Sequence, residues 1–307
     1  MSDNDDSIPL VELSPKDKSW DKHKHNADKV SNLYNSAGVG SYSLRVSLCA
    51  KQLQFALECT NNPDELVLKL KQAKFCRVRL CPICQWRRSL MWKAKAYKII
   101  PNLVADYPSL KYIFLTLTVK NCKLENLRCT IDWMNYAWRK LVKRKCFPAV
   151  GWIKSIEVTR NNYSKTVHPH IHALLAVKPS YFGKNYIKQS RWKELWKDSL
   201  KVSYTPVVHV RKVSDVQSSI PEIFKYTTKE SDYVTNDPEY LVELSEQLHK
   251  CRCFNTGGIL RQYFAVLEDD DDMIGTDDQD NVSGNNLSFS WNSTEQQYLS
   301  ETFPEKF

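Results

Sequence analysis

The segment HPHIHALLAV, residues 168–177, decides the fold class because it joins alternating histidines to an apolar run. In a β-strand, residues i and i+2 project from the same face. The pattern therefore predicts a buried strand from which His168, His170 and His172 point in one direction. Three imidazoles buried together would be costly without a ligand, which favours a metal site over a face of hydrogen-bonded histidines.

The preceding segment GWIKSIEVT, residues 151–159, predicts a partner strand, and the polar loop RNNYSKT between the two predicts a hairpin. That hairpin would bring Glu157 across from the histidines as a third ligand. A carboxylate beside two imidazoles suits Mg²⁺ or Mn²⁺ and leaves positions for phosphate oxygens. The alternative is an ordinary glutamate at a sheet edge or surface.

Beyond the hairpin, apolar periodicity predicts further strands and helices. The predicted strands are 111–119, 151–159, 168–177 and 204–213, and the predicted helices are 124–145, 186–200 and 219–233. This order indicates an α+β fold: a central antiparallel sheet of split βαβ (ferredoxin-like) topology with flanking helices, plus a Cys-containing helical N-terminal segment. In that topology the first strand lies beside the histidine strand.

The predicted helix 219–233 would align Glu222, Tyr226, Lys229 and Tyr233 on one face. Three of them have an ordinary alternative: Glu222 fits a capping box (S-x-x-E), Tyr226 fits a core aromatic, and Lys229 fits an exposed charge. A tyrosine near a metal site can instead act as a nucleophile on phosphorus.

A second cluster, Cys76, Cys81 and Cys84, has the spacing C-x₄-C-x₂-C. In a reducing compartment this pattern favours structural zinc over a redox pair or free thiols. A closed zinc site needs a fourth ligand. The open candidates are Cys49, Cys59, Cys251 and Cys253.

A basic, aromatic helix is predicted over residues 85–98, directly after these cysteines. We expect its cations to contact DNA phosphates, with a solvated helix face as the alternative. They are Arg87, Arg88, Lys93, Lys95 and Lys98.

Charge is distributed unevenly along the chain. The net charge is +9, yet residues 268–307 hold eleven acidic residues and one lysine, so the rest is strongly basic. A basic body rich in tryptophan and tyrosine favours a nucleic-acid partner. The sequence contains no apolar run long enough to span a membrane and no secretory signal at its start, which predicts a cytoplasmic protein.

These patterns predict four regions. They are a disordered segment at 1–40, a Cys-rich basic segment at 41–100, a catalytic domain at 101–267 and an acidic disordered tail at 268–307.

Three motifs stand in the order found in plasmid rolling-circle replication initiators of the histidine-hydrophobe-histidine (HUH) endonuclease superfamily. They are FLTLT at 114–118, HPHIHALL at 168–175 and EIFKYTTK at 222–229. The chain most resembles the class with one catalytic tyrosine and a glutamate one helical turn earlier. CRVRLCPICQWRR, residues 76–88, is similar to that family's cysteine-containing motif.

The resemblance implies that Tyr226 is the nucleophile that nicks single-stranded or cruciform origin DNA and forms a 5′-phosphotyrosine. His170 and His172 match the metal-binding pair, and Glu222 matches the glutamate that activates water at termination. Lys229 matches the motif lysine. A host polymerase would extend the free 3′ end, and a host helicase would unwind the duplex, because the chain lacks a P-loop.

Several alternatives stay open. Glu157 as third metal ligand has His168 as its rival, and Tyr233 is the rival nucleophile. Other functions are a single-tyrosine transposase or relaxase on the same core, or a non-catalytic zinc DNA-binding regulator. A regulator would keep all function after Tyr226→Phe, whereas an enzyme would lose nicking and keep origin binding.

Overall fold

The computed structural model describes four stretches of the chain. They are residues 7–59, 66–225, 227–265 and 286–300. The chain divides into two compact units, and we call them the N-terminal unit and the histidine unit. The N-terminal unit is Met1–Met91, Val234–Val242 and Asp272–Phe307, and the histidine unit is Trp92–Tyr233 and Glu243–Asp271. The histidine motif therefore lies in one unit and Cys76–Cys84 in the other.

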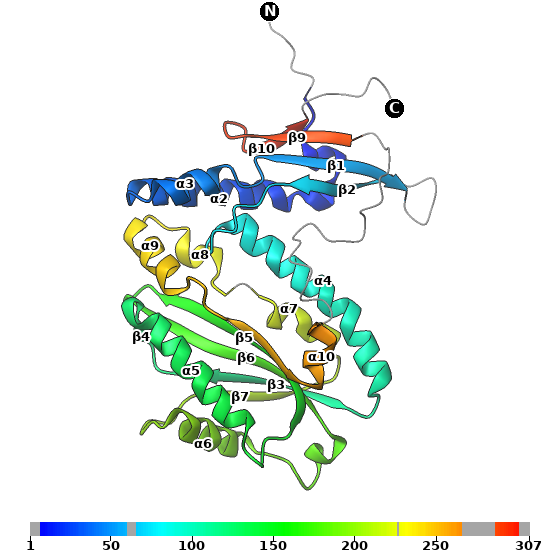
Figure 1. Cartoon of the computed structure of the whole chain (residues 1–307), viewed down its shortest axis with the longest axis vertical. Helices are drawn as coiled ribbons and strands as arrows, with labels where there is room; N and C mark the ends of the chain where they lie inside the picture. The colour runs from blue at the N-terminus through cyan, green and yellow to red at the C-terminus, as the bar shows by residue number, and fades with distance from the viewer. Residues whose placement is uncertain (1–6, 60–65, 226, 266–285, 301–307) are drawn as a thin grey trace, which may run out of the picture. The chain divides into compact units, whose positions relative to one another are not determined.

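The histidine unit is built on an antiparallel sheet with strand order β7-β3-β6-β5-β8, and β4 pairs with β6 off this path. The bounds are β3 Lys111–Thr118, β4 Cys122–Lys123, β5 Ala149–Asn161, β6 Thr166–Val177, β7 Val208–Val213 and β8 Phe254–Gly258. The histidine strand β6 lies between β3 and β5, so the predicted α+β class and the pairing of the first strand with it are confirmed (Figure 1). Strand β8 adds an edge that the sequence did not predict.

Helices α5 (Leu127–Val142) and α6 (Gln189–Leu200) lie on one face of this sheet (Figure 1). Helix α5 buries the apolar stripe expected from its 3.6-residue period. The stripe is Leu127, Ile131, Met134, Trp138 and Leu141. Both helices begin three residues later than predicted, because a 3₁₀ segment, η2 (Leu124–Asn126), precedes α5 and a loop precedes α6. That loop follows a second 3₁₀ segment, η3 (Pro179–Phe182).

On the opposite face of the sheet, the two ends of β6 carry different kinds of side chain. Leu174 and Ala176 continue the histidine face at two-residue spacing, and they are buried in an apolar cluster. That cluster also takes residues from the second half of α4 (Pro82–Asp106), from α7 (Ile220–Ile223) and from α10 (Ile259–Ala265). One end of this face is therefore core, while the other carries the histidines.

The prediction of a continuous helix over 219–233 is wrong. The 3₁₀ turn η4 (Gln217–Ser219) leads into α7, and the next helix, α8, covers only Glu230–Tyr233. Between them the Thr227 carbonyl accepts a hydrogen bond of 2.6 Å from the Val158 N–H of β5. Because the Thr227 carbonyl pairs with the edge of β5 beyond the end of β8, it does not accept the backbone hydrogen bond that a continuous helix would need.

The N-terminal unit contains a second antiparallel sheet of order β10-β9-β1-β2. Its strands are β1 Gln52–Cys59, β2 Leu66–Ala73, β9 Asn286–Asn292 and β10 Gln297–Ser300. Its helices are α1 Leu10–Leu13, η1 Pro15–Asp17, α2 Ser19–Ser36 and α3 Gly40–Ser47. The division between units passes through α4 and through α9 (Pro238–Gln247).

Two predictions of disorder are therefore wrong over most of their described residues. In the segment 1–40, α2 buries Trp20, Ala27, Val30 and Tyr34 at helical spacing. In the tail 268–307, strands β9 and β10 each carry buried residues at two-residue spacing, as a half-buried sheet requires. The acidic run 268–280 lies outside the described residues.

Candidate functional site

Glu157, His170 and His172 form one cluster on the sheet of the histidine unit. One ligand atom from each lies within 4.8 Å of the others. The register explains this: Glu157 on β5 pairs directly with His170 on β6. The Glu157 Oε2 atom is 3.1 Å from His172 Nε2 and 3.4 Å from His170 Nε2. The hairpin thus brings together three side chains that could hold a metal ion.

The other ring nitrogens show how the imidazoles are oriented. His170 Nδ1 lies 3.2 Å from the His168 carbonyl oxygen, which can only accept a hydrogen bond. Nδ1 is therefore placed to donate to this carbonyl, and Nε2 would be free to offer its lone pair if a metal ion were bound at the cluster. His172 Nδ1 faces Thr116 Oγ1 at 3.4 Å. Both Nε2 atoms are thus turned towards Glu157, as the second shell of a metal centre requires.

The Glu157 carboxylate is buried beside two imidazoles, and a bound cation would compensate its charge. Glu157 is 6% exposed and His172 is 7% exposed. Burial alone would raise the pKa of the Glu157 carboxyl, but hydrogen bonds and charge interactions with His170 and His172 outweigh it and lower that pKa. A buried carboxylate with two imidazole nitrogens fits a divalent ion as its counter-charge.

His168 is on the same strand face but is not in this cluster. Its Nδ1 lies 2.8 Å from Asn121 Oδ1, and its ring stacks on that of His170 with centroids 5.5 Å apart. Burial, followed by the neighbouring His170, lowers the pKa of His168. The geometry therefore suits His168 as a support for the His170 ring.

Glu222 and Lys229 both approach the cluster. Glu222 Oε1 is 4.0 Å from His172 Nδ1, and Lys229 Nζ is 4.0 Å from Glu157 Oε1. The predicted nucleophile, Tyr226, falls between them in sequence and lies outside the described residues. The rival Tyr233 is fully buried in the histidine unit.

The contacts of Glu222 do not fit the capping-box alternative. Ser219, at the N-cap of α7, makes no side-chain capping hydrogen bond within the described part of the chain. The Glu222 carboxylate instead accepts a hydrogen bond of 2.7 Å from Arg211 Nη2. The sequence did not single out Arg211, because one arginine in a strand carries no motif.

The N-terminal unit holds the second cluster. The Sγ atoms of Cys49, Cys76, Cys81 and Cys84 all lie within 4.8 Å of one another, so Cys49 joins the three local cysteines. Backbone N–H groups donate to these sulfurs, from Arg77 to Cys84 at 3.3 Å and from Cys76 to Cys49 at 3.4 Å. Such bonds are typical of thiolate ligands held for a metal.

The other candidates for a fourth ligand lie elsewhere. Cys59 is exposed, and Cys251 and Cys253 belong to the histidine unit. Arg77 has a φ of 56°, in the left-handed region, and this turn directs its N–H group towards Cys84. The described residues thus contain two groups that could hold a metal ion, one with mixed N and O donors and one with four thiols.

The basic helix predicted after the cysteines is the first part of α4. The Arg87 guanidinium lies over the rings of Trp20 and Trp86, at 5.3 and 5.6 Å from their centroids. The ammonium of Lys95 lies 5.6 Å from the Trp92 ring centroid. Burial lowers the pKa of Lys93, while Arg88 is half-buried. Arg87 and Lys95 are thus packed against aromatic rings.

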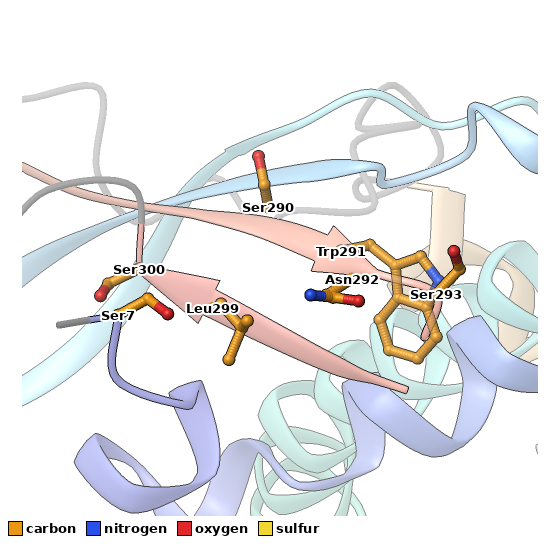
Figure 2. Close-up of a pocket in the computed structure, with 7 residues that line it drawn as sticks. All are labelled: Ser7, Ser290, Trp291, Asn292, Ser293, Leu299 and Ser300. Atoms are coloured by element: carbon orange, nitrogen blue, oxygen red, sulfur yellow. The ribbon is translucent and has the colours of Figure 1, made fainter. Parts of the chain in front are cut away.

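A pocket in the N-terminal unit is formed by the β9–β10 hairpin and Ser7, with Trp291 and Leu299 among its lining side chains (Figure 2). None of the predicted site residues lines this pocket.

Comparisons with known proteins identify the family. The family model "Replication protein" matches residues 67–299. A "Protein rep" of Streptococcus pneumoniae serotype 2 is 32% identical over 300 residues, covering 92% of each chain. A "Protein rep" of Bacillus amyloliquefaciens is 36% identical over 322 residues, covering 92% of this chain and 94% of the relative.

A further "Protein rep", from Lactiplantibacillus plantarum, is 37% identical over 234 residues and covers 69% of this chain. No solved structure matches the chain. Among the described residues no helix is both long and apolar enough to cross a membrane. The chain therefore belongs to the replication protein family, the group of plasmid rolling-circle initiators that its motifs resemble.

Proposed function

We propose that the chain is a site-specific nickase and strand transferase that starts plasmid rolling-circle replication by cutting single-stranded origin DNA. The observation that carries this proposal is the flanking of the Glu157–His170–His172 cluster by Glu222 and Lys229, each 4.0 Å from one of its members. Those two residues lie four positions before and three positions after Tyr226. Residues that precede and follow Tyr226 in the sequence therefore both lie beside the cluster.

The donor set fits Mn²⁺ or Mg²⁺ held by Glu157, His170 and His172. When bound, such an ion neutralises charge on the scissile phosphate. The Tyr226 oxygen forms a bond to phosphorus, the bond from phosphorus to the 3′-oxygen breaks, and the phenolic proton is passed on as the 3′-hydroxyl forms. The products are a 5′-phosphotyrosine and a primer end for a polymerase.

Lys229 and Glu222 have different roles in this proposal. The exposed Lys229 ammonium holds a phosphate oxygen beside the cluster. Glu222 takes a proton from water at termination, so that the last cut ends in hydrolysis rather than in another covalent complex. Burial of Tyr233 supports Tyr226 as the nucleophile.

We also propose that Cys49, Cys76, Cys81 and Cys84 hold one structural zinc ion. Four thiols complete a tetrahedral site and leave no position for substrate. The α4 cations Arg87, Arg88, Lys93 and Lys95 then serve origin recognition through phosphate contacts, alongside the strongly basic charge of the chain.

Incubation with Mn²⁺ and a labelled single-stranded origin oligonucleotide tests the nickase proposal. We expect a covalent protein–DNA adduct on a denaturing gel, and we expect His170→Ala to abolish it. His249→Ala is the matched control, because His249 is an exposed histidine of the same unit that lies outside the cluster. An adduct that survives His170→Ala would refute the metal assignment. A transposase or relaxase would also form an adduct, but it would not make a plasmid replicate from its origin.

A further inference from the structure

Arg211 connects the sheet to the glutamate of the tyrosine motif. It lies on β7, and its Nη2 donates to Glu222 Oε2 at 2.7 Å. The other carboxylate oxygen, Oε1, faces His172 Nδ1 at 4.0 Å. One carboxylate is therefore shared between a guanidinium on an edge strand and an imidazole of the candidate metal cluster.

The guanidinium is itself held in place. Arg211 pairs in register with Phe114 on β3, so both side chains stand on the same face of the sheet. The guanidinium carbon lies 4.6 Å from the Phe114 ring centroid, a cation–π contact. Phe114 is buried, and its ring centroid lies 5.7 Å from that of His172. Arg211 and His172 thus both lie beside the buried ring of Phe114.

The short helix that carries Glu222 does little to fix the orientation of its side chain. It projects from α7, which has only four residues, and its N-cap supplies no side-chain hydrogen bond within the described residues. The Arg211 side chain is 53% exposed, and ion pairs this exposed contribute little to stability. The pair is therefore better placed to orient a carboxylate than to stabilise the fold.

We propose that Arg211 is a positioning residue for hydrolytic cleavage, which rests on the nickase function proposed above. In that step the water oxygen bonds to phosphorus and the bond to the 3′-oxygen breaks. Glu222 takes the water proton, and the leaving 3′-oxygen gains one. The products are a 3′-hydroxyl and a free 5′-phosphate. Arg211 keeps the Glu222 carboxylate on the cluster side of α7, where the attacking water must lie.

The experiment measures two products from one labelled origin oligonucleotide with Mn²⁺: the covalent adduct and the free 5′-phosphate end. Arg211→Gln should lower the ratio of free end to adduct at least about tenfold, since a small misplacement of a catalytic group has effects of this size. Arg211→Lys should restore part of it, because an ammonium keeps the charge but not the planar fork.

Lys212→Gln is the matched control. It removes the same charge from the next residue of β7, where the ammonium lies over the ring of Phe182 instead. We expect the product ratio of Lys212→Gln to equal that of the wild type. An equal fall in both variants would mean that Arg211 acts only through general attraction of DNA, and it would overturn the proposal.

A double-mutant cycle gives the decisive arm. In a Glu222→Ala background, Arg211→Gln should cause no further loss of free ends, because both residues serve one step. A further loss of the same size would overturn the positioning role. Failure of the wild type to form any adduct would refute the nickase proposal itself. Normal wild-type products with an unchanged ratio in Arg211→Gln would refute this inference alone.

Discussion

The two candidate metal sites differ in what surrounds their ligands. Cys49, Cys76, Cys81 and Cys84 contribute four thiols, and backbone N–H groups point at their sulfurs. Glu157, His170 and His172 contribute three mixed donors, and charged side chains at their margin include those of Glu222 and Lys229. A full set of thiol ligands is typical of structural metal, whereas three ligands with nearby acid and base groups suit catalysis.

The largest effect should follow from opening the thiol cluster. We expect Cys81→Ser to lose one zinc ion per chain and to unfold the N-terminal unit at a much lower temperature, because structural zinc in small domains contributes on the order of 10 kcal/mol. Metal analysis and thermal denaturation check this. Cys59→Ser, at an exposed cysteine outside the cluster, should keep both the zinc and the melting temperature. Full zinc content in Cys81→Ser would contradict a structural zinc ion at the thiol cluster.

The next effect concerns the mixed-donor cluster. His172→Ala should lower the nicking rate by about 10³-fold, which is the loss expected when several kcal/mol of charge stabilisation disappear. Zinc content should stay at one ion per chain, because the thiol cluster is intact. Single-turnover nicking with Mn²⁺ and metal analysis of the same preparation give both numbers. Loss of the zinc together with nicking would mean that the two sites are not separate in function.

A smaller effect is expected from Lys229. Its side chain is 58% exposed and lies near Glu157, so its phosphate contact is partly screened by water. Lys229→Met should lower nicking about tenfold at low salt, and the deficit should shrink at high salt. Lys225→Met, an exposed lysine of the same segment, is the control. A deficit that does not depend on salt would point to a proton-transfer role instead.

A last prediction concerns the stability of the fold rather than activity, and it tests burial away from both sites. Burial lowers the pKa of Lys154 to about 8 from the ordinary 10.5, and its ammonium donates to Asn135 Oδ1 of α5. Between these two values the unfolded chain binds more protons than the folded one, so stability rises with pH across that window. The rise should be about 3 kcal/mol. Urea unfolding from pH 7 to 10.5 should show it in the wild type and not in Lys154→Met.

The hairpin and the sheet order could be predicted from sequence because the signals are local. Alternation at two-residue spacing fixed the face of His170 and His172, and a short polar loop fixed the pairing that brings Glu157 across. The stripe of α5 was equally clear. These features depend on neighbours within one or two elements.

What could not be predicted depends on distant partners. Cys49 lies 27 residues before Cys76, and no spacing rule links them. The break between α7 and α8 arises because the Thr227 carbonyl serves the edge of β5. Helix α2 has many charged residues, and even Lys24 is buried in it, bonding to Asp28 and to the Ser47 carbonyl. Its apolar stripe was therefore hidden by residues that usually lie on a surface.

The most direct test of the central claim is to identify the amino acid that becomes linked to DNA. After reaction with Mn²⁺ and the origin oligonucleotide, the protein is digested and the nucleotide-bearing peptide is sequenced by tandem mass spectrometry. We predict a 5′-phosphodiester on Tyr226, in the peptide between Glu222 and Lys229. A nucleotide on Tyr233 or on any other residue, or cleavage with no covalent peptide, would contradict the claim that this cluster directs Tyr226 chemistry.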